Sequence, residues 1–208
     1  MAAEDRARAL ALAPSLTPSI AEFETYERLI RQWQKKINLV AAPTLDELWT
    51  RHFADSAQIY ELEPRISRWA DLGSGAGFPG LVLAILLKDR PGAEVHLIES
   101  DQRKAAFLRA VSRETGAPAT VHCDRIEVAL PKLGDLQGVT ARALAPLPML
   151  VDWSRDHLLK TAKGVFLKGE GWRDELTALE AASNLNLQVI ESRTNSSARI
   201  VIVAKPTA

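Results

Sequence analysis

The 208-residue sequence has one cysteine, no net charge and no long apolar run. The single cysteine, Cys123, allows no internal disulfide, which is typical of intracellular proteins. Lys and Arg together number 26, as do Asp and Glu, and this balance excludes a globally basic, sequence-independent nucleic-acid coat protein. No apolar stretch is long enough to cross a membrane, and the N-terminal residues have no signal-peptide pattern. We therefore expect a cytoplasmic protein that does not contact membranes.

Two kinds of catalytic site are also missing from the sequence pattern. No group of His and Cys residues has the spacing of a metal site, so we expect no bound metal. No combination of serine, histidine and acid indicates a hydrolase. Hydrophobic residues make up 47% of the chain and charged residues 25%, which predicts a globular protein with a substantial core.

The first part of the chain, residues 1–65, is expected to be a helical segment. Residues 1–13 are rich in Ala and Arg and indicate either a frayed helix or a disordered lead. Apolar residues then recur at helical spacing in two stretches, residues 20–37 and 45–59. Each stretch follows a capping-box pair, and the pairs are Ser19 with Glu22 and Thr44 with Glu47.

From Trp69 onward, strand-like and helix-like segments alternate. The predicted strands cover residues 69–72, 95–99, 119–123, 138–143, 164–168, 187–192 and 199–204. Such alternation predicts a parallel sheet with helices on both faces and ligands at the carboxyl ends of the strands. Only a short connection precedes the last strand, so we expect that strand to be antiparallel. The prediction is an α/β, Rossmann-like, seven-stranded and mostly parallel sheet with a reversed last strand, in a domain spanning residues 66–208.

A glycine-rich segment, Asp71-Leu72-Gly73-Ser74-Gly75-Ala76-Gly77, follows the first predicted strand and leads into a helix. Glycine permits positive φ and has no Cβ to block a ligand, so the segment predicts a turn that faces an adenosine-containing ligand. Residues 75–80 spell G-x-G-x-x-G, the dinucleotide fingerprint. The alternative pattern begins at Asp71, as acid-apolar-Gly-x-Gly-x-Gly, and is typical of S-adenosylmethionine-dependent methyltransferases. A plain strand-to-helix connector is the third alternative.

The position of Asp71 favours S-adenosylmethionine over a dinucleotide. A carboxylate on the first strand would repel a pyrophosphate, whereas it can accept hydrogen bonds from the ammonium of S-adenosylmethionine. The reversed last strand strengthens this hypothesis, because class I methyltransferases have it and typical dinucleotide folds do not. A dinucleotide-dependent oxidoreductase is therefore the least favoured alternative.

Loops after the first three strands are predicted to bind the cofactor. Gly73, Gly75 and Gly77 would hold its methionine end. Glu99 would accept hydrogen bonds from both ribose hydroxyls, with a solvated loop acid as the alternative. Residues 124–127 would bracket the adenine edge while Ile126 stacks on the ring, with an ordinary helix N-terminus as the alternative.

Arg142 follows the fourth strand, where amino-methylating enzymes carry an Asp/Asn-Pro-Pro-Tyr/Phe element that this chain lacks. This departure favours a ring nitrogen with a free lone pair as the methyl acceptor, since such an atom needs placement and not deprotonation. We predict that Arg142 orders the cofactor carboxylate, a phosphate or a base oxygen, with a structural ion pair as the alternative. Basic residues near the same mouth would form a phosphate-binding rim, namely Arg31, Lys35, Lys36, Arg51, His52, Lys163, Lys168, Arg173 and Arg199.

Further motifs occur in a characteristic order from about residue 25 to the C-terminus. They are Trp33–Leu39, Arg51–Ser56, Asp71–Gly80, Lys104–Leu108, Arg125–Glu127, Ala141–Ala143, Leu167–Gly169 and the last strand with Arg199. Together they resemble the bacterial small-subunit ribosomal RNA guanine-N7 methyltransferases, also known as glucose-inhibited division protein B. The Arg-His-x-x-Asp-Ser element at residues 51–56 is the most specific, because general methyltransferases do not carry it.

This resemblance implies an enzyme that transfers a methyl group from S-adenosylmethionine to N7 of one guanosine in 16S rRNA. Free rRNA or the small ribosomal subunit would be its partner, and we expect a monomer. The implied cofactor contacts are Gly73, Phe78, Ile126, Glu127 and Arg142, the last also being the predicted catalytic residue. The residues implied to face the RNA are Asn38, Arg51, His52, Lys168 and Arg199. The alternatives are another RNA or a small molecule as methyl acceptor, and a non-catalytic rRNA-binding assembly factor.

Overall fold

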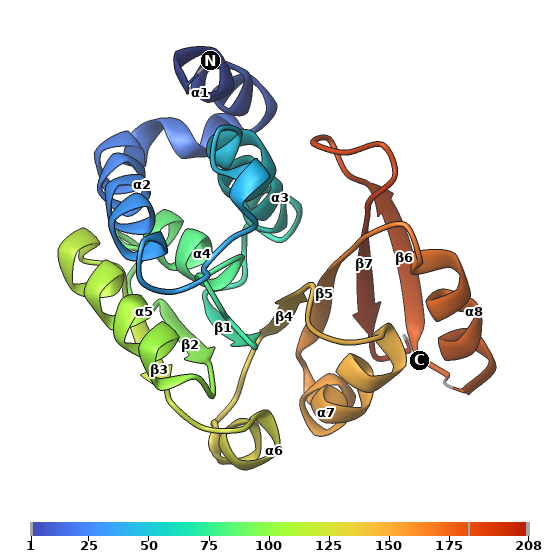
Figure 1. The fold of residues 1–208 in the computed structure, drawn as a ribbon. Coiled ribbons are helices and arrows are strands. Elements are labelled where there is room, and N and C mark those ends of the chain that lie inside the picture. The colour runs from blue at the N-terminus through green and yellow to red at the C-terminus, as the bar shows by residue number, and fades with distance from the viewer. Residues whose placement is uncertain (1, 183, 207–208) are drawn as a thin grey trace.

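The computed structural model describes residues 2–182 and 184–206, and a seven-stranded sheet forms its centre (Figure 1). The strand order is β3-β2-β1-β4-β5-β7-β6. The strands are β1 (Arg68–Leu72), β2 (Glu94–Ile98), β3 (Ala119–His122), β4 (Gly138–Arg142), β5 (Lys163–Lys168), β6 (Asn186–Glu191) and β7 (Arg199–Ala204). Each lies within one or two residues of its predicted position, because the apolar runs that identify the strands are also the segments that the sheet buries.

Strands β1 to β5 are mutually parallel, whereas β7 runs antiparallel to both β5 and β6. The predicted mostly parallel sheet with a reversed last strand is therefore confirmed. The chain order along the sheet reverses between β1 and β4, and both strands end at the same edge. Ligands of doubly wound sheets bind beside such a reversal, at the carboxyl ends of the strands.

Helices cover both faces of the sheet (Figure 1). The N-terminal part contains α1 (Ala2–Leu12), η1 (Pro14–Ser19), α2 (Ile20–Gln34), η2 (Ala42–Thr44), the π-helical η3 (Trp49–Ala54) and α3 (Asp55–Leu62). The remainder contains α4 (Gly80–Leu86), α5 (Gln102–Thr115), α6 (Ile126–Ala129), η4 (Leu130–Lys132), α7 (Leu147–Lys160) and α8 (Trp172–Ala182). None of these described helices combines the length and apolar composition needed to span a membrane.

Neither predicted capping box forms. The Ser19 side chain makes no cap hydrogen bond, and Glu22 instead forms an ion pair with Lys88. Thr44 ends η2 rather than opening an α-helix, and its hydroxyl donates to the Ala41 carbonyl at 2.7 Å. The acid of each predicted pair has a tertiary partner instead, Lys88 for Glu22 and Arg8 for Glu47. The second predicted stretch, residues 45–59, forms η3 and the first part of α3 instead of one regular α-helix.

Residues 2–12 form a packed helix, so the expectation of a disordered lead is wrong. Ala9 is fully buried, and Asp5 accepts hydrogen bonds from the backbone N–H groups of Trp49 and Thr50 at the start of η3. Helix α1 thereby supplies the acceptors that the amino end of η3 lacks within its own sequence.

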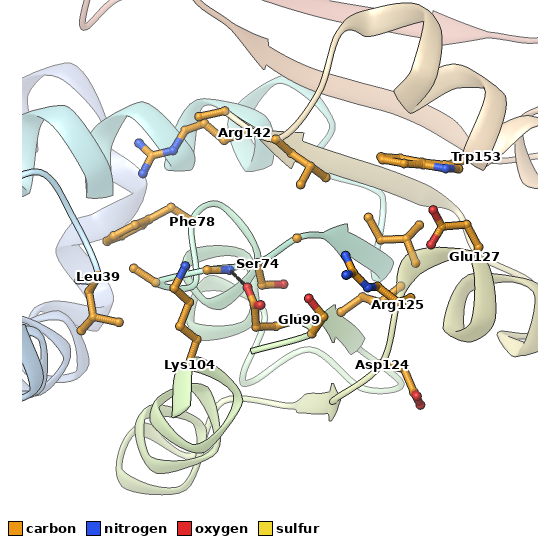
Figure 2. Close-up of a pocket in the computed structure, with 18 residues that line it drawn as sticks. Leu39, Ser74, Phe78, Glu99, Lys104, Asp124, Arg125, Glu127, Arg142 and Trp153 are labelled. Atoms are coloured by element: carbon orange, nitrogen blue, oxygen red, sulfur yellow. Dashed lines mark hydrogen bonds between the residues drawn. The ribbon is translucent and has the colours of Figure 1, made fainter. Parts of the chain in front are cut away.

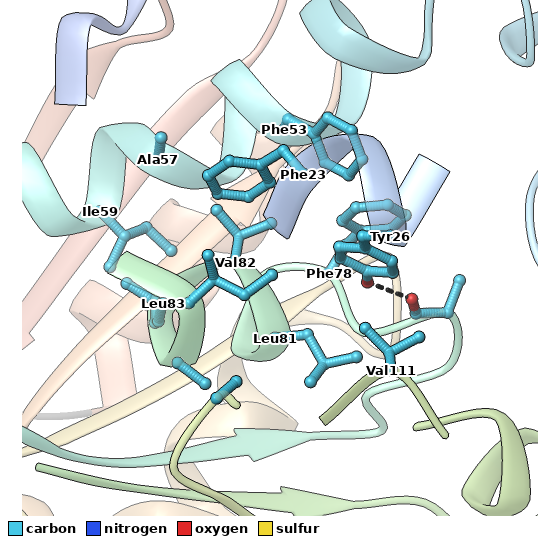
Figure 3. Packing of buried hydrophobic residues seen from close by; sticks show 14 of the residues in the cluster. Phe23, Tyr26, Phe53, Ala57, Ile59, Phe78, Leu81, Val82, Leu83 and Val111 are labelled. Atoms are coloured by element: carbon cyan, nitrogen blue, oxygen red, sulfur yellow. Dashed lines mark hydrogen bonds between the residues drawn. The ribbon is translucent and has the colours of Figure 1, made fainter. Parts of the chain in front are cut away.

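The N-terminal helices and α4 bury their apolar side chains in one cluster (Figure 3). Phe23, Tyr26 and Phe53 from the N-terminal part pack against Phe78 and Leu81, and all of them are at most 4% exposed. A division into residues 1–65 and 66–208 stays a prediction of domain organisation. The shared cluster means that the helical segment supports the loop after β1 directly.

Gly138, at the start of β4, provides a test of the packing between β1 and β4. A Cβ at this position would lie 2.3 Å from the Trp69 ring, whereas one at Gly134 would meet no atom within 4 Å. We expect Gly138→Ala to lower the free energy of unfolding by about 1–3 kcal/mol, because the ring has no space to move into. Urea unfolding of both variants checks this, with Gly134→Ala as the control. Equal stability of the two variants would contradict it.

Candidate active site

The loop after β1 is a turn of alternating glycines that is hydrogen-bonded to Asp71 of β1 and to Tyr26 of α2. Gly73, Gly75 and Gly77 have φ of +61°, +56° and +93°, a region that other residues rarely adopt. The Gly80 N–H donates to Asp71 Oδ2 at 3.1 Å, and the Tyr26 hydroxyl donates to the Ala76 carbonyl. These contacts fix the loop between the end of β1 and the first residue of α4.

Helix α4 begins directly after the loop, at Gly80. Pro79 is its N-cap residue, and the Phe78–Pro79 peptide bond is cis. The ring of Phe78 is only 4% exposed, yet it borders the cavity above the loop.

A cavity of about 430 Å³ lies above the glycine loop (Figure 2). This volume is within the range of small-molecule and cofactor sites. The predicted cofactor residues that line it are Gly73, Gly75, Phe78, Glu99, Ile126, Glu127 and Arg142. The sequence did not predict several other lining residues, because no chemical signal separates them from ordinary core or surface residues; they include Leu39, Lys104, Leu144 and Trp153.

Glu99 is held in place by the loop that it faces. Its side chain is buried, Oε2 accepts the Gly75 N–H at 2.9 Å and Oε1 accepts the Asp101 N–H at 2.7 Å. The alternative of a solvated loop acid is therefore wrong. An ionised carboxylate has about four acceptor positions, so each oxygen retains capacity for a further donor. Acceptance of two ribose hydroxyls stays a prediction that this geometry permits.

Asp71 and Gly77 do not line the cavity. Asp71 is completely buried beneath the loop. Its Oδ1 has no hydrogen-bond partner among the described residues. Burial raises the pKa of Asp71 to about 7, against the opposing effect of the Ser74 and Gly80 hydrogen bonds. A direct contact with the cofactor ammonium stays a prediction. The structure itself shows Asp71 supporting the loop from below.

Arg142 lies at a wall between two cavities and is held by four groups. Nη2 lies 2.7 Å from His52 Nδ1, while Nη1 donates to the Arg51 carbonyl at 3.1 Å and lies 3.4 Å from Asp55 Oδ2. The guanidinium carbon is 4.8 Å from the centre of the Phe78 ring. The structural ion pair considered as an alternative is therefore present, and Arg142 nevertheless lines both cavities.

His52 is a neutral support for Arg142. Burial, with the charges of Arg142 and Arg51, lowers the pKa of His52 to about 3. Because Arg142 can only donate, Nδ1 is the acceptor and the proton is on Nε2, which lies 2.9 Å from Thr44 Oγ1. The imidazole also stacks on Phe78 with ring centres 4.8 Å apart.

The second cavity, of about 520 Å³, shares Arg142 and Ala143 with the first. It is lined by four of the five residues predicted to face RNA, which are Arg51, His52, Lys168 and Arg199. The fifth, Asn38, lines a separate cavity formed by residues 34–42. Ala143 has φ +52°, so the junction of the two main cavities is also a strained backbone position.

Most cations of the second cavity are paired with acids that the sequence reasoning did not assign to the site. Lys168 Nζ lies 2.7 Å from Glu175 Oε2 and donates to the Ala145 carbonyl at 2.8 Å. Arg199 lies 3.3 Å from Glu191. Among the described cations that line this cavity, Arg51 alone has no carboxylate partner. The part of the predicted basic rim that lines this cavity is thus largely neutralised.

Two other members of the predicted rim pair with carboxylates that do not line the second cavity. Lys163 begins β5, so it lies at the opposite edge of the sheet from Lys168, where it pairs with Glu63 at 2.6 Å. Placing Lys163 near the site was wrong, because a strand of this length separates its two ends by several residues of extended chain. Arg31 pairs with Glu27 within α2 at 2.8 Å.

The Tyr26 hydroxyl tests the support of the loop by the helical segment. Tyr26→Phe keeps the ring stack with Phe78 and removes only the donor to the buried Ala76 carbonyl. We expect a loss of about 1–3 kcal/mol in the free energy of unfolding and weaker cofactor binding, measured by urea unfolding and calorimetry. Tyr60→Phe is the control, since Arg90, at 3.5 Å, is the one hydrogen-bond partner of that half-buried hydroxyl among the residues that the structure describes. If Tyr26→Phe has the same cofactor affinity and stability as the wild type, the Tyr26 hydroxyl does not stabilise the loop.

The raised pKa of Asp71 predicts a pH dependence of stability. The unfolded carboxyl titrates near pH 4, so between pH 4 and about 7 the folded state binds more protons and stability falls as pH rises. Asp71→Asn does not titrate. We therefore expect its free energy of unfolding, relative to the wild type, to increase from about pH 5 to about pH 7.5. Asp152→Asn, at an exposed position, is the control, and a relative stability independent of pH in Asp71→Asn would contradict the burial argument.

Solved structures of other methyltransferases have the same fold at low sequence identity. The magnesium protoporphyrin IX methyltransferase of Synechocystis PCC 6803, solved with bound SAM, gives a TM-score of 0.58 at 11% identity, covering 87% of this chain and 97% of that chain. A methyltransferase from Geobacter sulfurreducens gives 0.60 at 12% identity, covering 89% of each chain. These similarities concern the fold alone, and they confirm the predicted class I methyltransferase architecture.

Sequence similarity extends along nearly the whole chain. Residues 19–200 match the GidB family, described as rRNA small subunit methyltransferase G. The Ribosomal RNA small subunit methyltransferase G of Parvibaculum lavamentivorans is 56% identical over 156 residues, covering 74% of this chain and 68% of that protein. The protein of the same name from Bradyrhizobium sp. (strain ORS 278) is 46% identical over 202 residues, covering 97% and 91%. The predicted resemblance is confirmed, and the chain belongs to the GidB family of small-subunit rRNA methyltransferases.

Proposed function

We propose that this enzyme transfers a methyl group from S-adenosylmethionine to N7 of one guanosine in the 16S rRNA of the small ribosomal subunit. The observation that carries the proposal is the pair of cavities that meet at Arg142 and Ala143. One lies above a methyltransferase-type glycine loop, and the other is lined by four of the five residues predicted to face RNA. The names of its family relatives supply rRNA as the acceptor class.

The first cavity fits S-adenosylmethionine. A Cβ at Gly75 would meet only the Gly73 carbonyl, at 3.8 Å, and would otherwise project into open space, so the glycine leaves room for a ligand. Glu99 retains acceptor capacity for ribose hydroxyls, and Ile126 offers an apolar surface for a purine ring. When bound, S-adenosylmethionine supplies a methyl group on a positively charged sulfur.

The acceptor atom requires no general base from the protein. Guanine N7 carries a free lone pair on the Hoogsteen edge, so placement and exclusion of water are sufficient. His52 lines the second cavity, but both of its nitrogens are engaged, with Arg142 and Thr44. It therefore supports the site and does not act as a base.

Arg142 is suited to a limited contact with the acceptor. A guanidinium has five N–H groups, of which about three are directed at His52, Asp55 and the Arg51 carbonyl. The remaining donors can contact a phosphate, the cofactor carboxylate or guanine O6. A bidentate contact to N7 and O6 would cover the attacked atom, and the existing hydrogen bonds disfavour it.

The finer features of the proposal come from the sequence. They are a cytoplasmic location, action as a monomer and chemistry without a metal. In the part of the chain that the structure describes, no group of three or more His, Cys, Asp or Glu residues could hold a metal ion. Another acceptor and a non-catalytic assembly role remain the alternatives that the experiment below separates.

Methyl transfer is tested with tritiated S-adenosylmethionine and small subunits from cells that lack this enzyme. We expect label on N7 of a single guanosine, and Arg142→Gln should lower kcat/KM by roughly 100-fold, because the site loses a group that positions the acceptor. Arg155→Gln is the matched control, since Arg155 is exposed on α7 and, within the described part of the chain, pairs with Asp152 alone, at 3.8 Å.

Free 16S rRNA in parallel reactions identifies the preferred form of the substrate. Cofactor binding measured by calorimetry distinguishes the remaining cases. Binding without label on subunits or free rRNA would refute the rRNA assignment and leave another acceptor, whereas absence of both would favour an assembly factor.

A further inference from the structure

Asp55, the first residue of α3, is bonded on both sides of its carboxylate. Oδ2 lies 3.4 Å from Arg142 Nη1, and Oδ1 accepts the Thr194 hydroxyl at 2.6 Å. Ser192 Oγ and Gln58 Nε2 also lie 3.4 Å from Oδ1. The side chain is 14% exposed, and it lines the second cavity. Four donors thus fill the acceptor positions of one carboxylate.

The segment between β6 and β7, residues 192–198, is bonded to α3 through the Asp55 carboxylate and the Gln58 side chain. Gln58 is 2% exposed, donates to Ser192 Oγ at 3.2 Å and accepts the Arg193 N–H at 2.8 Å. Thr194, Asn195 and Ala198 of the same segment line the second cavity. The carboxylate of Asp55 therefore joins one wall of that cavity to the arginine that the two cavities share.

Asp55 differs from the other groups that hold Arg142. The His52 imidazole is neutral and the Arg51 carbonyl is a backbone group, so Asp55 is the one carboxylate of the described residues within ion-pair distance of Arg142. Hydrogen bonds in which one partner is ionised are about twice as strong as neutral ones. An asparagine has nearly the same shape, but it removes the charge and replaces one acceptor by a donor.

We propose that Asp55 is a positioning residue for methyl transfer, which orients Arg142 and couples it to the β6–β7 segment at residues 192–198. This inference rests on the proposed function, because it assigns a role within the same site. Asp55 acts on the reaction through Arg142 and not by contacting the methyl acceptor or the cofactor. Residues 51–56 carry the family-specific motif, and the structure gives its acid this definite partner.

The proposal is tested with Asp55→Asn and Thr194→Val, each assayed for kcat and KM with small subunits. We expect Asp55→Asn to lower kcat/KM by roughly 10- to 100-fold, since a small misplacement of a positioning group has effects of this size. Thr194→Val should lower kcat/KM by a smaller factor, because it removes the hydroxyl that donates to Asp55 but leaves the carboxylate beside Arg142. Asp152→Asn, which breaks an exposed ion pair on α7, is the matched control and should match the wild type.

A second readout follows Arg142 without requiring activity. Phenylglyoxal modifies accessible arginines, and peptide mass spectrometry reports the rate at each position. Arg142 is 18% exposed in its side chain, so we expect slow modification in the wild type and faster modification in Asp55→Asn, with Arg155 unchanged. In Asp152→Asn, we expect the modification rate of Arg142 to stay at the wild-type value and that of Arg155 to increase, because Arg155 loses its ion pair.

Double variants separate positioning from a general structural effect. If Asp55 acts through Arg142, adding Asp55→Asn to Arg142→Gln should reduce kcat/KM no further than Arg142→Gln alone. Multiplying losses, an Asp55→Asn activity within twofold of the wild type, or an unchanged modification rate of Arg142 would each overturn the proposal. Absence of methylation by the wild type would instead refute the proposed function, and the modification rates would still decide whether Asp55 holds Arg142. If Asp55→Asn does not fold, Thr194→Val carries both readouts.

Discussion

The aromatic ring of Phe78 is the contact on which the arrangement of the site depends. Tyr26 of α2 stacks on it with ring centres 5.5 Å apart, and His52 of η3 stacks on it at 4.8 Å. Arg142, from the end of β4, lies over the same ring at 4.8 Å. Phe78 itself belongs to the glycine loop, so one side chain relates the loop, the N-terminal helices and the shared wall of the two cavities. Aromatic packing is strongly dependent on geometry, and a shift of any one partner would therefore be transmitted to the others.

The charges around the second cavity suit selective recognition better than general attraction of nucleic acid. Arg142, Lys168 and Arg199 all have carboxylate partners, which agrees with the zero net charge of the chain. A neutralised site gives weak steering at a distance, because phosphate attraction depends on uncompensated cations. It also keeps each cation in a defined orientation. Under the proposed function, selectivity for one guanosine then depends on shape and a few directed donors, and Arg51 is the described lining cation without a carboxylate partner.

Periodicity and glycine placement were enough to predict the strands, the reversed last strand and the loop after β1, because these depend on residues near each other in sequence. The charge partners were not predictable in this way. Arg142 and Asp55 are 87 residues apart, and their contact exists only once α3 packs beside the end of β4. The same limitation explains the failed capping boxes. The sequence predicts that Glu22 caps the start of α2. In the structure it forms an ion pair with Lys88, which follows α4 and is 66 residues away in the sequence.

The π-helical turn at η3 explains how one short motif can serve both the core and the site. The Asp55 N–H bonds to the carbonyls of His52 and Thr50, whereas a regular α-helical turn would direct it to the carbonyl of Arg51. The Arg51 carbonyl accepts Arg142 instead. Trp49 and Phe53 of the same turn remain buried in the aromatic cluster. Wide turns of this kind are frequently found at functional sites, and here the turn gives the helical segment two faces, one that packs under the glycine loop and one that holds Arg142. The N-terminal helices are therefore part of the candidate active site and not an appendage to the sheet.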